Sequence, residues 1–379
     1  MNAYSHLCGS LSSHGLVVVA PDHRDGSCPV SFVTDPQTKK LQKVEYRKIA
    51  HKPSPETYEA RDEQLRIRLW ELGLIHDALL KVDKGSPLTN LQSHLPSKRK
   101  ATDNKDLLGM FVGRLDVHTP GSISFAGHSF GAASVVQFMK ATFYPASDSQ
   151  DPNYKPLFNP SRSSSIVRQV TSSTPVALLD LWNLPLLSPA TAWTKAKPMP
   201  CYHSAEGGSR LVAILSDAFF KWKPNLRETL ITVSKPSNSN FPDQAGPHIF
   251  YPISSAHLSQ SDFGVLFRWA TTKIFGAKEP ERVLRLNVRA ILQTLRNSGI
   301  EVAATSALDR ELAQNDVATA EGADSPHDLE ILSTTKGTVR DWISLDTHMP
   351  LGDEKEEKGP ADAVVEGEVL GEVIKPSDQ

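Results

Sequence analysis

The feature that most constrains this chain is a Gly-Xaa-Ser-Xaa-Gly pentapeptide at residues 127–131, which follows an apolar run and leads into a helix-like run. A serine hydroxyl is a weak nucleophile until a sharp turn between a strand and a helix exposes it. Such a turn needs small neighbours, which Gly127 and Gly131 supply. The alternative is an ordinary glycine-rich turn. The pattern predicts that Ser129 is a nucleophile and that the Phe130 amide, at the positive end of the helix, stabilises an oxyanion.

Composition excludes several classes of protein. The chain has 379 residues and is 39% hydrophobic, which is enough for a globular core. Its 41 basic and 43 acidic residues nearly cancel, so we expect no nucleic-acid partner. Cys8, Cys28 and Cys201 contain no CxxC pair, which favours a reducing, cytoplasmic location. We expect no metal and no cofactor, and the apolar runs are too short to span a membrane.

Short apolar runs alternate with amphipathic runs along the first 300 residues. The apolar runs predict strands at residues 16–20, 123–126, 175–180 and 248–253, with a weaker candidate at 198–204. The amphipathic runs predict helices at residues 4–13, 56–82, 209–222, 261–274 and 282–297. This alternation predicts an α/β fold in which helices flank a mostly parallel sheet.

Two stretches leave alternatives open. Residues 22–27 follow a predicted strand, where open α/β sheets place their ligands, so they either border a site or hold an ion pair between Arg24 and a neighbouring aspartate. The apolar residues 107–115 follow a loop with a basic run at residues 98–100. They either enter a lipid interface or pack beneath the strand that precedes Ser129.

Three residues with complementary chemistry each follow a different predicted strand. They are Ser129, Asp180 and His257, and their order along the chain is that of the α/β-hydrolase fold. The carboxyl ends of parallel strands lie along one edge, so we expect a catalytic triad there. In this interpretation Ser129 attacks a carbonyl, His257 transfers the proton, and Asp180 orients the imidazole.

Other histidines are weaker candidates for the proton-transfer role. His128 lies inside the turn and is expected to point away from the hydroxyl of its neighbour, while His203 and His248 are expected in the core or at a sheet edge. Cys201 and His203 lack a second pair of metal ligands, so they predict no metal site.

Five groups of residues together resemble the platelet-activating factor acetylhydrolase family, of the plasma and type II kind. These groups are residues 11–27, 61–65, 127–131, 179–182 and 256–263, and the resemblance covers residues 2 to about 300. It implies a calcium-independent serine esterase that removes acetyl, short or oxidised acyl groups from the sn-2 position of glycerophospholipids. It also implies Ser129, Asp180 and His257 as the triad and the Phe130 amide as one oxyanion donor. We expect a phospholipid substrate and transient contact with a membrane surface.

The sequence departs from the family pattern at its beginning. Family members carry Ser-His-Gly-Leu-Gly at the end of a strand before the helix that begins here near Asn2, and the next residue supplies a second oxyanion amide. We therefore expect an N-terminally truncated gene model or isoform whose sheet lacks its first strands, including one between residues 16–20 and 123–126. The alternative function is a catalytically impaired hydrolase that binds lipid or a partner.

Beyond residue 300 the chain becomes acidic and poor in aromatic residues, which indicates disorder except at residues 338–345. We therefore expect an α/β-hydrolase domain over residues 1–300 and a largely disordered tail over residues 301–379. Deleting residues 303–379 is expected to change neither the melting temperature nor the esterase rate.

Overall fold

A computed structural model describes residues 3–29, 31–88, 108–146, 154–314 and 324–349 of the chain. Its main sheet has five strands in the order β3-β4-β5-β6-β7. The strands are β3 (Phe125–His128), β4 (Val176–Leu179), β5 (Leu211–Ile214), β6 (His248–Pro252) and β7 (Trp342–Ser344). The first four are parallel and β7 is antiparallel to β6. The mostly parallel sheet flanked by helices is therefore confirmed.

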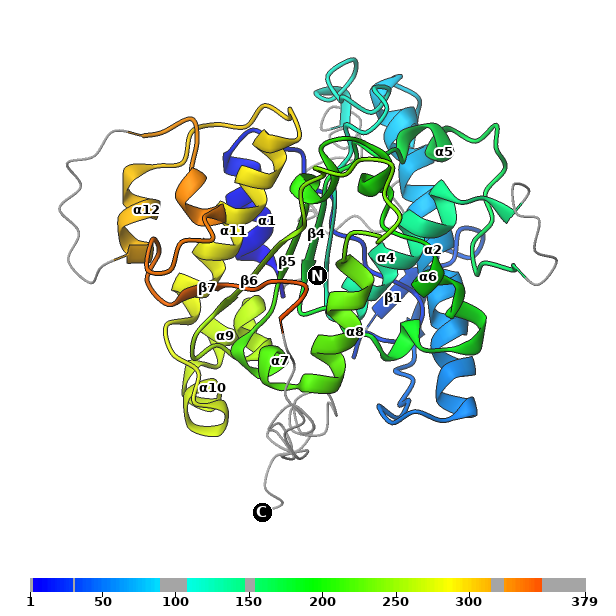
Figure 1. Ribbon diagram of the computed structural model, residues 1–379. Coiled ribbons are helices and arrows are strands. Elements are labelled where there is room, and N and C mark those ends of the chain that lie inside the picture. Colours follow the sequence, from blue (N-terminus) through cyan, green and yellow to red (C-terminus); the bar gives the residue numbers. More distant parts are fainter. Residues whose placement is uncertain (1–2, 30, 89–107, 147–153, 315–323, 350–379) are drawn as a thin grey trace, which may run out of the picture.

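Side chains of the central strands alternate between two cores, one on each face of the sheet. Ala177 and Leu179 of β4 pack with α1 (Ser5–Ser13) and α11 (Pro280–Asn297). Val176 and Leu178 pack on the other face, which is covered by α2 (Pro55–Asp83), α4 (Phe130–Phe143) and α8 (Lys223–Val233). Figure 1 shows α1 and α11 on one side of the strands and α2 and α4 on the other.

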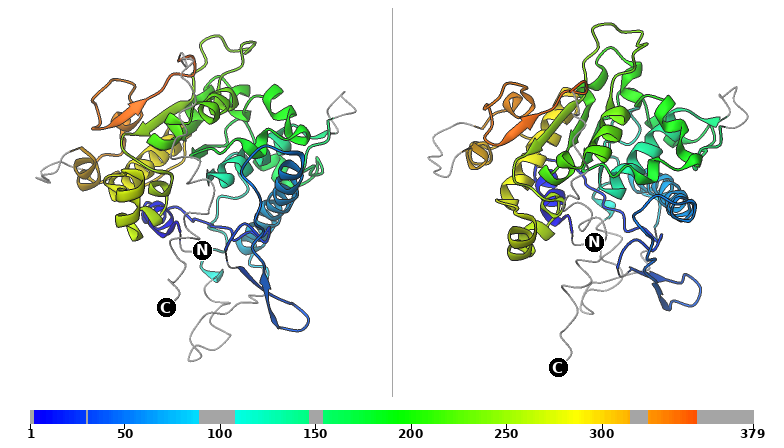
Figure 2. Two further views of the ribbon diagram at one scale, coloured as in Figure 1. Left: turned by 90° about the horizontal axis from the view of Figure 1, so that it is seen from below. Right: turned by 60° about the horizontal axis from the view of Figure 1, so that its bottom comes forward.

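Shorter elements connect these layers. They are the helices α5 (Ser165–Gln169), α6 (Trp193–Ala196) and α7 (Asp217–Lys221) and the 3-10 turns η2 (Leu184–Leu186), η3 (Pro189–Thr191), η5 (Gly207–Arg210) and η6 (His257–Gln260). A separate antiparallel hairpin, β1 (Ser31–Thr34) and β2 (Leu41–Val44), projects from the rest of the fold (Figure 2).

The helix predicted at residues 209–222 is wrong in its first part. Leu211–Ile214 form the central strand β5, and the helical turns come afterwards in α7. The strand candidate at residues 198–204 is also wrong, because it contains the 3-10 turn η4 (Pro200–His203). A short apolar run fits either a buried strand or a buried helix segment, and its periodicity alone does not distinguish them. The helix predicted at residues 261–274 is two helices, α9 (Phe263–Leu266) and α10 (Arg268–Phe275).

The buried strand predicted at residues 16–20 does not form in the structure. Leu16 and Val18 pack against the α1 and α11 side of the core, whereas Val17 and Val19 are 53% and 47% exposed. In the described part of the chain, β3 lies at the sheet edge and pairs with β4. A β-branched run becomes a strand only where a neighbour completes its backbone ladder.

The predicted end of the folded region at residue 300 is wrong for the described residues. Beyond it lie α12 (Ala307–Gln314), η7 (Leu329–Leu332) and β7. The Trp342 ring stacks on the Phe250 ring with 5.1 Å between the ring centres, and its indole N–H donates to the Ile331 carbonyl at 2.8 Å. The prediction rested on the acidic average composition of this region, which does not reflect its few buried apolar residues, such as Ile331 and Trp342. Residues 98–100 and 350–379 lie outside the described residues.

Candidate active site

Ser129 occupies a strained turn between β3 and α4. Its backbone has φ 57° and ψ −118°, a conformation that is costly for a residue other than glycine. Its N–H donates to the Leu179 carbonyl at 2.9 Å, which holds the turn against β4. Phe130 is the first residue of α4, so its N–H has no acceptor within the helix and lies at the helix's positive end. This geometry is that of a nucleophile elbow.

Asp180 lies beside this turn at the end of β4. The parallel register pairs His128 with Leu179, so Ser129 and Asp180 end neighbouring strands. The Asp180 carboxylate is fully buried. It accepts a hydrogen bond from the Ser216 N–H at 2.5 Å and forms a 2.8 Å bond with Nδ1 of His257. With Nδ1 engaged in this way, Nε2 of His257 is the atom left for proton transfer.

The His257 imidazole is held by aromatic contacts as well as by Asp180. The Phe219 ring stacks on it with 4.7 Å between the ring centres and an interplanar angle of 13°. The His128 ring lies against it with 4.4 Å between the ring centres and an interplanar angle of 36°. His257 is itself the first residue of η6, which follows β6. A ring packed in this way retains one orientation relative to the carboxylate.

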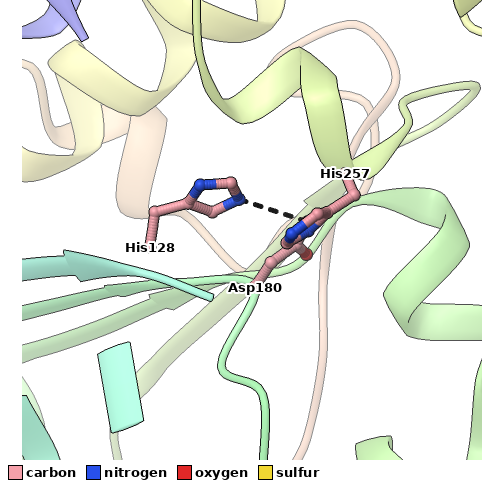
Figure 3. A group of neighbouring side chains, drawn as sticks. All are labelled: His128, Asp180 and His257. Atoms are coloured by element: carbon pink, nitrogen blue, oxygen red, sulfur yellow. Dashed lines mark hydrogen bonds and ion pairs between the residues drawn. The ribbon is translucent and has the colours of Figure 1, made fainter. Parts of the chain in front are cut away.

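His128 is a residue of this site that the sequence interpretation set aside. Figure 3 shows its ring beside Asp180 and His257. Its Nε2 lies 4.0 Å from Oδ2 of Asp180, and its Nδ1 bonds to the Tyr4 hydroxyl at 2.7 Å. Burial, with a further contribution from His257, lowers the pKa of His128 well below its ordinary value. The register of β3 against β4 could have placed it here, because it pairs with the residue before Asp180.

One ring nitrogen of His128, one of His257 and one carboxylate oxygen of Asp180 all lie within 4.8 Å of one another. Such a donor set could in principle hold a divalent ion. However, Asp180 and His257 already bond to each other. A metal ion between them would have to break that bond, so the arrangement fits proton transfer better.

The polar residues 22–27 contact the start of α4 through Arg68. Nε of Arg68 pairs with Asp25 at 2.5 Å, and its guanidinium lies 4.0 Å from the centre of the Phe130 ring. Burial would raise the pKa of Asp25, but the charge and hydrogen bonds of Arg68, with those of Ser27, lower it. The predicted ion pair of Arg24 with a neighbouring aspartate is therefore wrong, because Asp25 pairs with Arg68 on α2.

The remaining candidates lie in other surroundings. His203 bonds through Nε2 to the Tyr144 hydroxyl at 2.7 Å. Cys201 lies in the core, and burial raises the pKa of its thiol to about 12. His248 begins β6.

Comparison with known proteins adds to this geometry. Residues 1–192 match the model of a family described as platelet-activating factor acetylhydrolase, isoform II. The chain is 26% identical over 319 residues to the Schizosaccharomyces pombe protein named "Putative phospholipase A2", a match that covers 79% of this chain and 65% of that protein. It is 29% identical over 136 residues to the platelet-activating factor acetylhydrolase of Bos taurus, covering 35% of this chain and 28% of that protein. These matches span less than two thirds of each relative's length.

Proposed function

Because this chain belongs to the platelet-activating factor acetylhydrolase family, isoform II, we propose that it is a calcium-independent serine esterase. Its substrates are glycerophospholipids with an acetyl, short or oxidised acyl group at the sn-2 position. The observation that carries the proposal is the 2.8 Å bond between Asp180 and His257. Asp180 follows the carboxyl end of β4, next to the end of β3 where Ser129 occupies its strained turn.

In the proposed mechanism, Oγ of Ser129 attacks the sn-2 carbonyl carbon while Nε2 of His257 takes the hydroxyl proton. The Phe130 N–H donates to the oxyanion that forms. Collapse of this intermediate breaks the ester bond, and His257 returns the proton to the departing lysophospholipid oxygen. Water then attacks the acyl-serine ester by the same route, which releases the carboxylic acid and regenerates Ser129. Throughout, Asp180 holds the imidazole and stabilises its positive charge.

Substitution of the nucleophile tests this proposal. Ser129→Ala should lower the release of acetate from an sn-2-acetyl phospholipid, measured in EDTA, by at least about 10³-fold. It should also abolish labelling by a fluorophosphonate. The control is Ser13→Ala, because Ser13 is an exposed serine whose hydroxyl bonds to the Ser10 carbonyl and to the neighbouring His14.

Unchanged turnover by a folded Ser129→Ala protein would contradict the proposed role of Ser129. A folded wild-type chain that neither reacts with the probe nor releases acetate would instead favour the alternative, a lipid-binding or partner-binding protein.

We also propose that α9 and α10 provide the transient contact with a membrane surface. Leu266 and Trp269 are 65% and 67% exposed, and Arg268 and Lys273 add positive charge. This segment begins six residues after His257. In Figure 1 it lies at the bottom, the end of the sheet at which α7 also lies. An exposed surface that combines apolar and cationic side chains suits an anionic lipid interface. In the described part of the chain, no helix is long and apolar enough to cross a bilayer.

The residues 108–113 are not packed beneath β3, because Leu108, Met110 and Val112 are 39–58% exposed. This corrects the packing alternative for that run.

Sedimentation with anionic vesicles tests the α9 and α10 surface. Trp269→Ala should weaken binding, whereas Trp70→Ala, which removes a tryptophan 59% exposed on α2, should not. Equal binding by both variants would argue against this surface.

The cytoplasmic location stays a prediction that cell fractionation can check.

A further inference from the structure

Tyr4 and His128 form a hydrogen-bonded pair that the proposed mechanism does not use. The Tyr4 hydroxyl, just before α1, reaches Nδ1 of His128 at 2.7 Å. Asp262 fixes the beginning of α1: its carboxylate accepts the N–H groups of Ser5 at 2.5 Å and His6 at 3.1 Å. Asp262 lies five residues after His257. The segment that carries His257 therefore also holds Tyr4 against His128.

The surroundings of this pair determine which ring nitrogen of His128 carries its proton. Burial raises the pKa of Tyr4, which keeps the phenol protonated, and burial lowers the pKa of His128, which keeps the imidazole neutral. A neutral imidazole has one N–H. If Tyr4 donates to Nδ1, the proton of His128 lies on Nε2.

Nε2 of His128 is buried and has no hydrogen-bond partner among the described residues. It lies 4.0 Å from Oδ2 of Asp180, the oxygen that bonds to His257. An N–H dipole on Nε2 is attracted to that carboxylate, whereas a lone pair on Nε2 would be repelled by it. The Asp180 carboxylate therefore favours the tautomer with the proton on Nε2, and in that tautomer Nδ1 accepts the hydrogen bond of the Tyr4 hydroxyl.

We propose that Tyr4 and His128 are positioning residues for the triad: the Tyr4 hydroxyl keeps the proton of His128 on Nε2, and this N–H dipole orients the Asp180 carboxylate towards His257. A neutral His128 does so without placing a second positive charge beside His257 when that ring is protonated. This inference rests on the proposed esterase function, since it assigns roles within the same site.

The kinetic test removes the Tyr4 hydroxyl but keeps its ring. Tyr4→Phe should lower kcat for 4-nitrophenyl acetate by about tenfold, the effect of one lost hydrogen bond, with KM unchanged. The matched control is Tyr154→Phe, which removes a hydroxyl that donates to the Tyr144 carbonyl at 2.6 Å. The control should lose similar stability but keep its kcat. An unchanged kcat in Tyr4→Phe would overturn the proposal.

Two substitutions at His128 separate orientation from packing. His128→Gln retains an N–H that can face Asp180, whereas His128→Leu retains only bulk. The glutamine variant should therefore keep a larger share of kcat than the leucine variant. Equal kcat values in the two folded variants would show that His128 acts through packing alone.

The tautomer can also be measured without any activity. In ¹⁵N-histidine spectra of the wild-type chain, His128 should show a protonated Nε2 and an unprotonated Nδ1, and Tyr4→Phe should change this pattern. A proton on Nδ1 in the wild-type chain would overturn the proposal even if Tyr4→Phe fails to fold. If instead the tautomer is as expected and the wild-type chain hydrolyses no ester, the proposed function fails rather than the tautomer assignment.

Discussion

Gly127 and Gly131 flank Ser129 at equal distances in sequence, yet side chains at the two positions would have different surroundings. A Cβ on Gly127 would lie 2.4 Å from the carbonyl oxygen of Gly131. A Cβ on Gly131 would have no heavy atom within 4 Å. The need for a small residue, predicted at both positions, therefore applies to Gly127 alone.

A pair of alanine substitutions tests this difference. Gly127→Ala should lower the free energy of unfolding by about 1–3 kcal/mol or more, because backbone atoms must move to admit the methyl group. Gly131→Ala should raise it by up to about 1 kcal/mol, because alanine favours helix and Gly131 lies in α4. Urea unfolding measures both values. Equal destabilisation by the two variants would show that the turn is more crowded than the structure indicates.

At the scale of elements, α4 is enclosed on every side, and this enclosure determines the chemistry of Lys140. All residues from 132 to 142 are buried. Nζ of Lys140 donates to the Thr194 carbonyl at 2.6 Å. Burial lowers the pKa of Lys140 to about 7. Because an unfolded lysine titrates near 10.4, between these two values the unfolded chain binds a proton that the folded chain does not.

Stability should therefore rise with pH above about 7, by up to about 1.4 kcal/mol per pH unit from this group. Lys140→Met should remove this contribution, so the free energy of unfolding of the variant should depend less steeply on pH between 7 and 9 than that of the wild type. Lys195→Met, a change at a 43% exposed side chain, should keep the wild-type slope. Parallel slopes for Lys140→Met and wild type would mean that Lys140 stays charged in the folded chain.

At the scale of the whole molecule, residues after 300 complete the core around α11. Arg289 makes two hydrogen bonds to Asp328, at 2.6 and 2.8 Å, and both side chains are almost fully buried. Breaking a buried ion pair typically costs about 3–5 kcal/mol. The expectation that residues 303–379 can be deleted without loss of stability is therefore replaced by the opposite prediction.

Asp328→Asn should lower the melting temperature by several degrees, and deletion of residues 303–379 should lower it further. The control is Glu63→Gln, which alters the exposed Arg47–Glu63 pair and should lower the free energy of unfolding by less than about 1 kcal/mol. Calorimetry measures the melting temperature of all three variants. A deletion variant that melts at the wild-type temperature would show that β7 and η7 contribute little.

The sequence alone determined the features that depend on residues close together in the chain. The turn at Ser129, the strand end before Asp180 and the helices α2 and α11 follow from glycine placement, short apolar runs and helical periodicity, which act over a few residues. These local patterns also brought Ser129, Asp180 and His257 to one sheet edge in the sequence interpretation.

Only the tertiary structure decided the features that depend on distant partners. Leu211–Ile214 became a strand because β4 and β6 pair with it on both sides, while residues 16–20, with a similar apolar pattern, remained outside the sheet. His128 lies in the site because β3 pairs with β4 in a register that places it beside Leu179, the residue before Asp180, and Tyr4, 124 residues away, bonds to its ring there. Backbone pairing and burial are supplied by other segments, so no local pattern of residues can specify them.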